Sequence, residues 1–168
     1  MGPLDRLLSS DPRETLQFFF SGLRDVTSGQ AVDEAAVLYN ASVLAHFAST
    51  STGTTSGLPT PASLGDVFDR FVLDSAWRDD PGMLEIAGAQ CLLLTGFFAD
   101  HLKSRYNLDW YGDLGAGFYG TAASLSRTPA HRQMMSHMAG RFDYWRSRHL
   151  RLSRDLRDLP YLGIFKAY

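Results

Sequence analysis

Residues 107–125, NLDWYGDLGAGFYGTAASL, decide the fold class of this chain. At 100° per residue, Gly112 and Ala116 share one smooth face, and Trp110 and Phe118 lie on the bulky face opposite. A face of small side chains lets a neighbouring backbone come close, whereas the bulky face fills a core. Each glycine costs a helix about 1 kcal/mol relative to alanine, so close packing must offset that cost. The stretch therefore predicts a buried, Gly/Ala-rich central helix.

The same stretch contains GAGFYG at residues 115–120, which matches the G-x-G-x-x-G pattern of phosphate-binding loops. That fingerprint requires a buried strand before it, a βαβ unit around it and an acidic residue about 20 positions later. The preceding RYNLDWYGDL is no buried strand, and no other run alternates over strand length. We therefore interpret the glycines as a helix-packing surface.

Helix start signals recur along the chain. Asp11-Pro12, Asp80-Pro81 and Thr128-Pro129 each place a capping residue before a proline at the first helical position. Together with apolar residues at helical spacing, these signals predict an all-α, single-domain bundle of about six helices. The expected helices cover residues 12–27, 33–48, a short segment around 67–72, 81–102, 107–125 and 129–159.

Length and composition are those of one globular domain, residues 1–168, with 45% hydrophobic and 20% charged residues. The Ser-, Thr-, Gly- and Pro-rich stretch 49–66 is expected to form a flexible loop within it. Cys91 is the only cysteine, so the fold needs no disulfide, and we expect Cys91 to be a small buried hydrophobe.

Targeting signals are not evident. Residues 1–17 contain no apolar core typical of a secretory signal. The most apolar stretch, 83–98, is interrupted by Glu85 and Gln90 and is too short for a membrane span. We expect a cytoplasmic protein without a membrane-spanning helix.

The leading hypothesis is a non-enzymatic helical protein that acts through protein–protein interaction or self-association. Apolar residues form a heptad-like stripe along the last expected helix, and its members are Met138, Phe142, Trp145, His149, Leu152, Leu156 and Leu159. Residues 1–100 carry five Arg against thirteen acidic residues, whereas 124–168 carry nine basic against three acidic residues, so these two parts would attract each other, either within one molecule or between copies. The predicted interface residues are Gly112, Ala116, Trp145, His149 and Leu152.

A second hypothesis is a helical pocket for a small apolar or aromatic ligand, with catalysis by Tyr, His or Asp left open. Its candidate lining residues are Tyr106, Trp110, Tyr111, Tyr119 and His101. No cofactor is indicated. The five histidines form no i, i+4 pair and no Glu-x-x-His occurs, so no metal site is expected.

A third hypothesis is nucleic-acid binding through arginines of the last expected helix. These arginines are Arg132, Arg146, Arg151, Arg154 and Arg157. The pI of about 6.2 and the lack of a known nucleic-acid motif place this hypothesis third.

Overall fold

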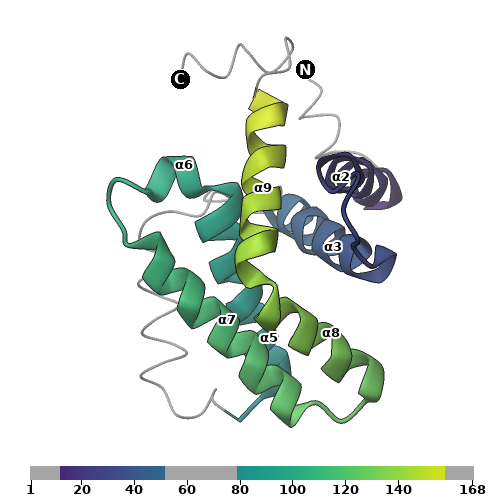
Figure 1. The fold of residues 1–168 in the computed structure, drawn as a ribbon, viewed down its shortest axis with the longest axis vertical. Coiled ribbons are helices and arrows are strands. Elements are labelled where there is room, and N and C mark those ends of the chain that lie inside the picture. Colours follow the sequence, from purple (N-terminus) through teal and green to yellow (C-terminus); the bar gives the residue numbers. More distant parts are fainter. Residues whose placement is uncertain (1–11, 52–78, 158–168) are drawn as a thin grey trace. The chain divides into compact units, whose positions relative to one another are not determined.

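The computed structural model describes residues 12–51 and 79–157 (Figure 1). Of these residues 84% are helical, in seven α-helices, and none lies in a strand. The all-α prediction is confirmed. The chain divides into a first compact unit, residues 1–58 with 148–168, and a second compact unit, residues 59–147. The expectation of one domain for the whole chain stays a prediction.

The first unit contains α2 (Pro12–Val26), α3 (Glu34–Ser51) and the second part of α9 (Phe142–Arg157). The chain turns between α2 and α3 at Gly29, whose φ of 82° lies in the left-handed region that glycine tolerates. Helix α3 continues three residues past its expected end. The rest of the predicted loop, 52–66, and the expected helix around 67–72 lie outside the described residues.

The core of the first unit is formed where α2, α3 and α9 meet. Leu23 and Leu44 are buried there. A Cβ atom on Gly22 would lie 2.7 Å from Leu152 Cδ1, so the glycine admits that side chain. Arg148 Nη1 donates a hydrogen bond to Val26 O at 3.0 Å, which ties α9 to the end of α2.

The second unit contains α5 (Pro81–Leu92), the π-helical segment η3 (Leu93–Phe97), α6 (Ala99–Leu102), α7 (Leu108–Leu125), α8 (Pro129–Gly140) and the start of α9. Asp80 caps α5 with its side-chain oxygen, as the sequence predicts, and Asn107 caps α7 in the same way. Helix α7 packs against both α5 and α8 (Figure 1). The prediction of a central Gly/Ala-rich helix is confirmed.

Two glycines of this unit make room for aromatic rings. A Cβ atom on Gly115 would lie 2.6 Å from Phe142 Cζ and 2.7 Å from Cys91 Cβ. One on Gly88 would lie 2.9 Å from the ring of Tyr119. The contacts that require glycine are therefore those of α7 with α5 and with the first turn of α9, all within the second unit.

The expected continuous helix over 81–102 is interrupted. Thr95 Oγ1 donates to Cys91 O at 2.6 Å, and Phe98 N donates to Leu93 O, five residues back, at 2.9 Å. Phe98 then leaves the helical region, with φ −100° and ψ 14°. The prediction of one helix was wrong here, because a π turn widens the backbone at Leu93–Phe97.

The prediction of a single helix over 129–159 was also wrong. Arg141 has φ −117° and ψ 24°, so α8 ends at Gly140 and α9 begins at Phe142. Glycine favours such an end because it is a poor helix former. Residues 158 and 159 lie outside the described part of the chain.

Cys91 is fully buried, as expected, and burial raises the pKa of its thiol to about 12. None of the helices in the two described ranges has both the length and the apolar character that crossing a membrane requires.

Candidate functional site: the α2–α3 groove

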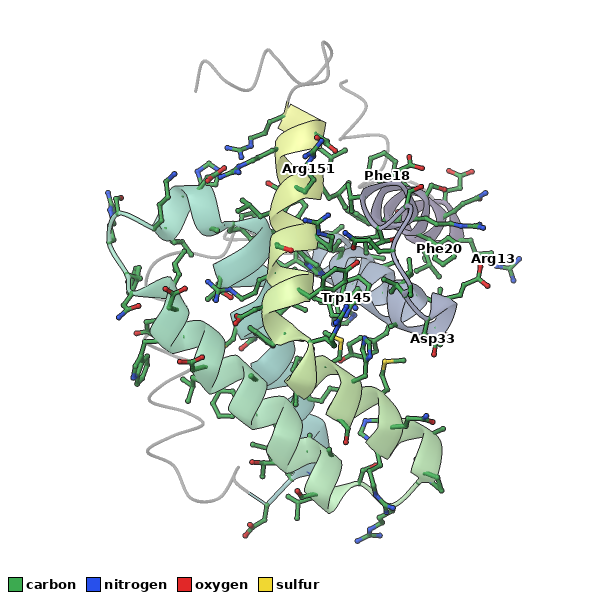
Figure 2. The ribbon with its side chains drawn as sticks, viewed as in Figure 1. Arg13, Phe18, Phe20, Asp33, Trp145 and Arg151 are labelled. Atoms are coloured by element: carbon green, nitrogen blue, oxygen red, sulfur yellow. The ribbon has the colours of Figure 1, made fainter. Side chains whose placement is uncertain are left out.

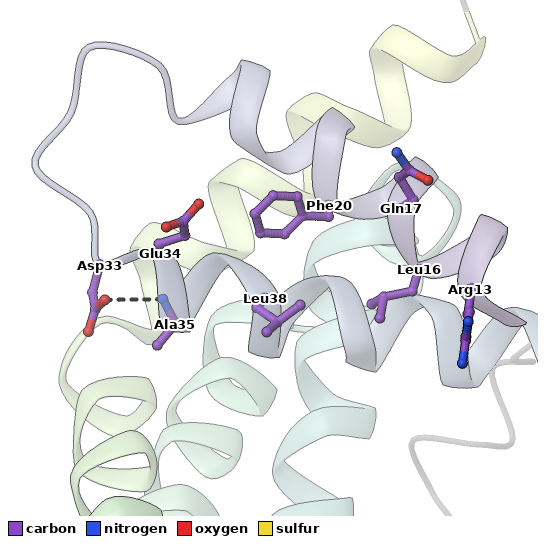
Figure 3. Close-up of a pocket in the computed structure, with 8 residues that line it drawn as sticks. All are labelled: Arg13, Leu16, Gln17, Phe20, Asp33, Glu34, Ala35 and Leu38. Carbon is purple, nitrogen blue, oxygen red and sulfur yellow. Dashed lines mark hydrogen bonds between the residues drawn. The ribbon is translucent and has the colours of Figure 1, made fainter.

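A groove of about 660 Å³ lies between α2 and α3 in the first unit (Figure 3). Its lining is mostly apolar. The lining residues are Arg13, Leu16, Gln17, Phe20, Asp33, Glu34, Ala35 and Leu38.

Helical periodicity explains why these residues meet. Arg13, Leu16 and Phe20 follow each other at i, i+3 and i+7 and so share one face of α2. Leu23, farther along α2, is completely buried in the core. Leu16 and Phe20 are only partly buried, so α2 carries more apolar surface than the core covers, and on the α3 side Leu38 stays 46% exposed.

The two ends of the groove carry opposite charges. Asp33 and Glu34 stand at the start of α3, and Arg13 stands at the other end, with the apolar side chains between them (Figure 3). Asp33 Oδ1 accepts a hydrogen bond from Ala35 N at 3.1 Å, which holds its carboxylate at the helix start. Figure 2 shows Arg13 extending outward from α2. A partner surface would therefore meet an apolar strip with a charge at each end.

The sequence predicted a helix over residues 12–27 with apolar residues at helical spacing, but it did not predict the groove. Leu38, Asp33 and Glu34 become part of it only through the pairing of α2 with α3. One signal was available: residues 18–20 are three consecutive phenylalanines, which span about 200° of a helix, too wide an arc for one core contact.

The predicted interface residues lie in the interior or at its margin. Trp145 is fully buried in the second unit and its Nε1 donates to His137 Nε2 at 3.0 Å. In the first unit, Leu152 contacts Gly22, and His149 is fully buried. These three side chains fill the cores of their own units, which leaves the exposed apolar strip of the α2–α3 groove as the better surface for a partner.

The other two predicted interface residues border a smaller cavity of about 330 Å³ in the second unit. Gly112 and Ala116 line it on α7, opposite the junction of α8 and α9. At that junction the guanidinium of Arg141 lies 4.6 Å from the ring centre of Tyr144. The smooth face of α7 at Gly112 and Ala116 thus borders a polar cavity.

The predicted ligand-binding residues are brought together only in part. Tyr111 makes edge contacts with Tyr106 and Trp110, at ring-centre distances of 5.9 and 4.9 Å. Tyr106 and Tyr111 also pack on the buried pair Leu94 and Leu102. The remaining two candidates are placed differently: Tyr119 is fully buried against Phe142 and Gly88, and His101 is exposed.

A hydrogen-bonded chain joins α5 to the turn between α7 and α8. His131 Nε2 lies 2.7 Å from Glu85 Oε1, and His131 Nδ1 lies 2.7 Å from Ser126 Oγ. The order serine, histidine, carboxylate is that of a nucleophilic triad. Ser126 is only 5% exposed, however, and a nucleophile must reach its substrate. We infer that these hydrogen bonds hold the turn between α7 and α8 against α5.

Arginines of the proposed nucleic-acid face already have acidic or backbone partners. In the second unit, Arg146 is 15% exposed and forms ion pairs with Asp143 at 3.1 Å and Asp109 at 3.5 Å. In the first unit, Arg151 pairs with Asp155 at 3.2 Å. These pairs reduce the positive charge available to phosphates.

Comparisons with family models, curated proteins and solved structures find no match to this chain.

Proposed function

We propose that this protein is a non-enzymatic, cytoplasmic helical protein that acts through protein–protein interaction or self-association, by binding an amphipathic helical surface of a partner molecule in the α2–α3 groove. The observation that carries the proposal is the groove of about 660 Å³, in which Leu38 is 46% exposed between charged ends. Exposed apolar surface rimmed by polar groups is typical of protein-binding sites.

The chemistry of the groove specifies its partner. The strip of Leu16, Phe20 and Leu38 favours the apolar side of a helix, with anchors at i, i+3, i+4 and i+7. The charged ends favour a basic group near Glu34 and an acidic group near Arg13. The partner is therefore an amphipathic helical surface with charge at both ends.

The test introduces a charge into the groove. Leu38→Asp places a carboxylate where a partner would bury Leu38, so we expect association to weaken at least tenfold, about 1.4 kcal/mol or more. Ile86→Asp is the matched control, because Ile86 on α5 is 48% exposed and lies outside the groove.

The readout is affinity purification with each variant as bait, together with co-expression of differently tagged copies of this chain. Circular dichroism checks that both variants fold. A partner retained by wild type and Ile86→Asp but lost by Leu38→Asp supports the proposal. If every partner survives Leu38→Asp, the groove is not the binding surface.

A further inference from the structure

We infer that the partner of the α2–α3 groove is the same groove of a second copy of this chain, related by a two-fold axis. This inference rests on the proposed function and names its partner. It comes from the distribution of charge along the groove, with Arg13 at one end and Asp33 and Glu34 at the other (Figure 3).

A two-fold axis that lies in the plane of the interface, perpendicular to the long direction of the groove, exchanges the two ends of the groove. When two copies face each other about such an axis, Arg13 of each copy lies opposite Asp33 and Glu34 of the other. The opposite alignment would place like charges together. The groove is therefore complementary to itself in one relative orientation only, which gives a closed dimer and no open chain of copies.

The apolar strip meets itself under the same operation. Leu16, Phe20 and Leu38 lie between the charged ends, so they pack on their counterparts near the axis. Four helices then form the interface, an arrangement in which side-chain ridges fit into grooves of the facing pair. The exposed part of Leu38 becomes buried in the dimer.

The size of the face sets the strength of the dimer. Helices of 15 and 18 residues are about 22 and 27 Å long, and two side by side are about 20 Å wide. One copy thus contributes roughly 400–500 Å², at the low end for specific interfaces. We therefore expect dissociation constants in the micromolar range, and measurements must cover about 1–100 μM.

The experiment is a charge swap on the full-length purified chain, followed by sedimentation equilibrium. At the upper concentrations we expect the wild-type protein to have a molar mass of twice 18.7 kDa. Arg13→Glu and Glu34→Arg each place like charges opposite one another, so each should weaken the dimer at least tenfold. The double variant restores opposite charges and should dimerise at least tenfold more tightly than either single variant.

Two controls change charge by the same amount outside the groove. Glu14→Arg alters an exposed acid in the first turn of α2, and Arg127→Glu alters an exposed arginine of the second unit. Both should dimerise like wild type. The double variant carries the stability costs of both single changes, so its recovery arises from restored complementarity and not from a more stable monomer.

The outcomes separate this inference from the proposed function. A wild type that is monomeric at 100 μM, a dimer indifferent to Arg13→Glu and Glu34→Arg, or a swap that restores nothing overturns self-recognition. If a different protein then binds wild type and is lost on Leu38→Asp, the groove is still a protein-binding site. If Leu38→Asp changes no association, the proposed function fails as well.

Discussion

His149 Nε2 donates a hydrogen bond to Asn40 Oδ1 at 2.9 Å, between side chains separated by 109 positions in the sequence. Asn40 Nδ2 donates in turn to Ala36 O at 2.8 Å, which fixes the orientation of the amide. Both residues are fully buried in the first unit. Within the described residues, His149 Nδ1 has no hydrogen-bond partner, so the ring is held neutral with its proton on Nε2.

Because His149 is buried in its neutral form, we expect the folded protein to lose stability in acid. Burial lowers the pKa of His149 from 6.5 to about 3, so below pH 6.5 the unfolded chain binds a proton that the folded chain does not. The free energy of unfolding then falls with decreasing pH, by about 1.4 kcal/mol per unit, until pH approaches 3. The pH dependence from this residue fades as pH rises above 6.5, because the unfolded chain then also leaves the imidazole unprotonated.

Urea unfolding at pH 7 and pH 5 measures this effect. His149→Gln keeps a donor for Asn40 but does not titrate in this range, so it is the reference that removes the contribution of the carboxylates. We expect wild type to lose about 2 kcal/mol more than His149→Gln between the two pH values. Equal losses would show that His149 is not buried in the neutral form.

Three glycines of α7 should respond differently to alanine. Gly115→Ala forces a Cβ atom against Phe142 and Cys91, which are rigid neighbours, and should destabilise the fold by about 1–3 kcal/mol. A Cβ atom on Gly117 would meet nothing within 4 Å, so Gly117→Ala should stabilise by up to about 1 kcal/mol through helix propensity. The atoms nearest to a Cβ atom on Gly112 belong to the flexible side chain of Arg146, so Gly112→Ala should have an effect between those of the other two variants.

Thermal and urea unfolding rank the three variants, and the reaction of Cys91 with a thiol reagent gives a second readout. The buried thiol should stay unreactive in wild type and become accessible at lower urea in Gly115→Ala. An unaltered stability of Gly115→Ala would contradict the close packing of α7 on α5 and α9.

Arg146 and Gly112 should behave as a coupled pair. A Cβ atom on Gly112 would lie 2.5 Å from Arg146 Nη1, and the guanidinium is held by Asp143, Asp109 and Thr95 O. Gly112→Ala displaces the guanidinium from these contacts, whereas in an Arg146→Ala background nothing is displaced. A double-mutant cycle should therefore give a coupling energy above about 0.5 kcal/mol, and additive effects would argue against the contact.

Ser126, His131 and Glu85 should contribute to stability and not to hydrolysis. Ser126→Ala removes the partner of His131 Nδ1 and should cost about 1 kcal/mol of unfolding free energy. We expect no labelling of wild type by a fluorophosphonate and no Ser126-dependent hydrolysis of p-nitrophenyl acetate. Either activity, if lost in Ser126→Ala, would assign the serine a catalytic role.

Most helix positions follow from local features of the sequence. Asp80 and Asn107 are capping residues whose side chains bond within the next three positions, and the small and bulky faces of α7 depend only on the 3.6-residue period. Such features act over one or two turns, so the all-α class, the limits of α2 and α7 and the start of α5 could be predicted from the sequence to within a few residues.

Other features depend on contacts between distant segments. The break at Gly140–Arg141 and the π segment Leu93–Phe97 interrupt two predicted helices, although the apolar spacing continues through both. The groove exists because α3 brings Leu38 opposite Leu16 and Phe20, and His149 is neutral because folding buries its ring. Sequence alone determined which residues are helical and which face of each helix is apolar. Tertiary structure decided which of those faces are covered, because burial depends on side chains that only the folded chain brings together.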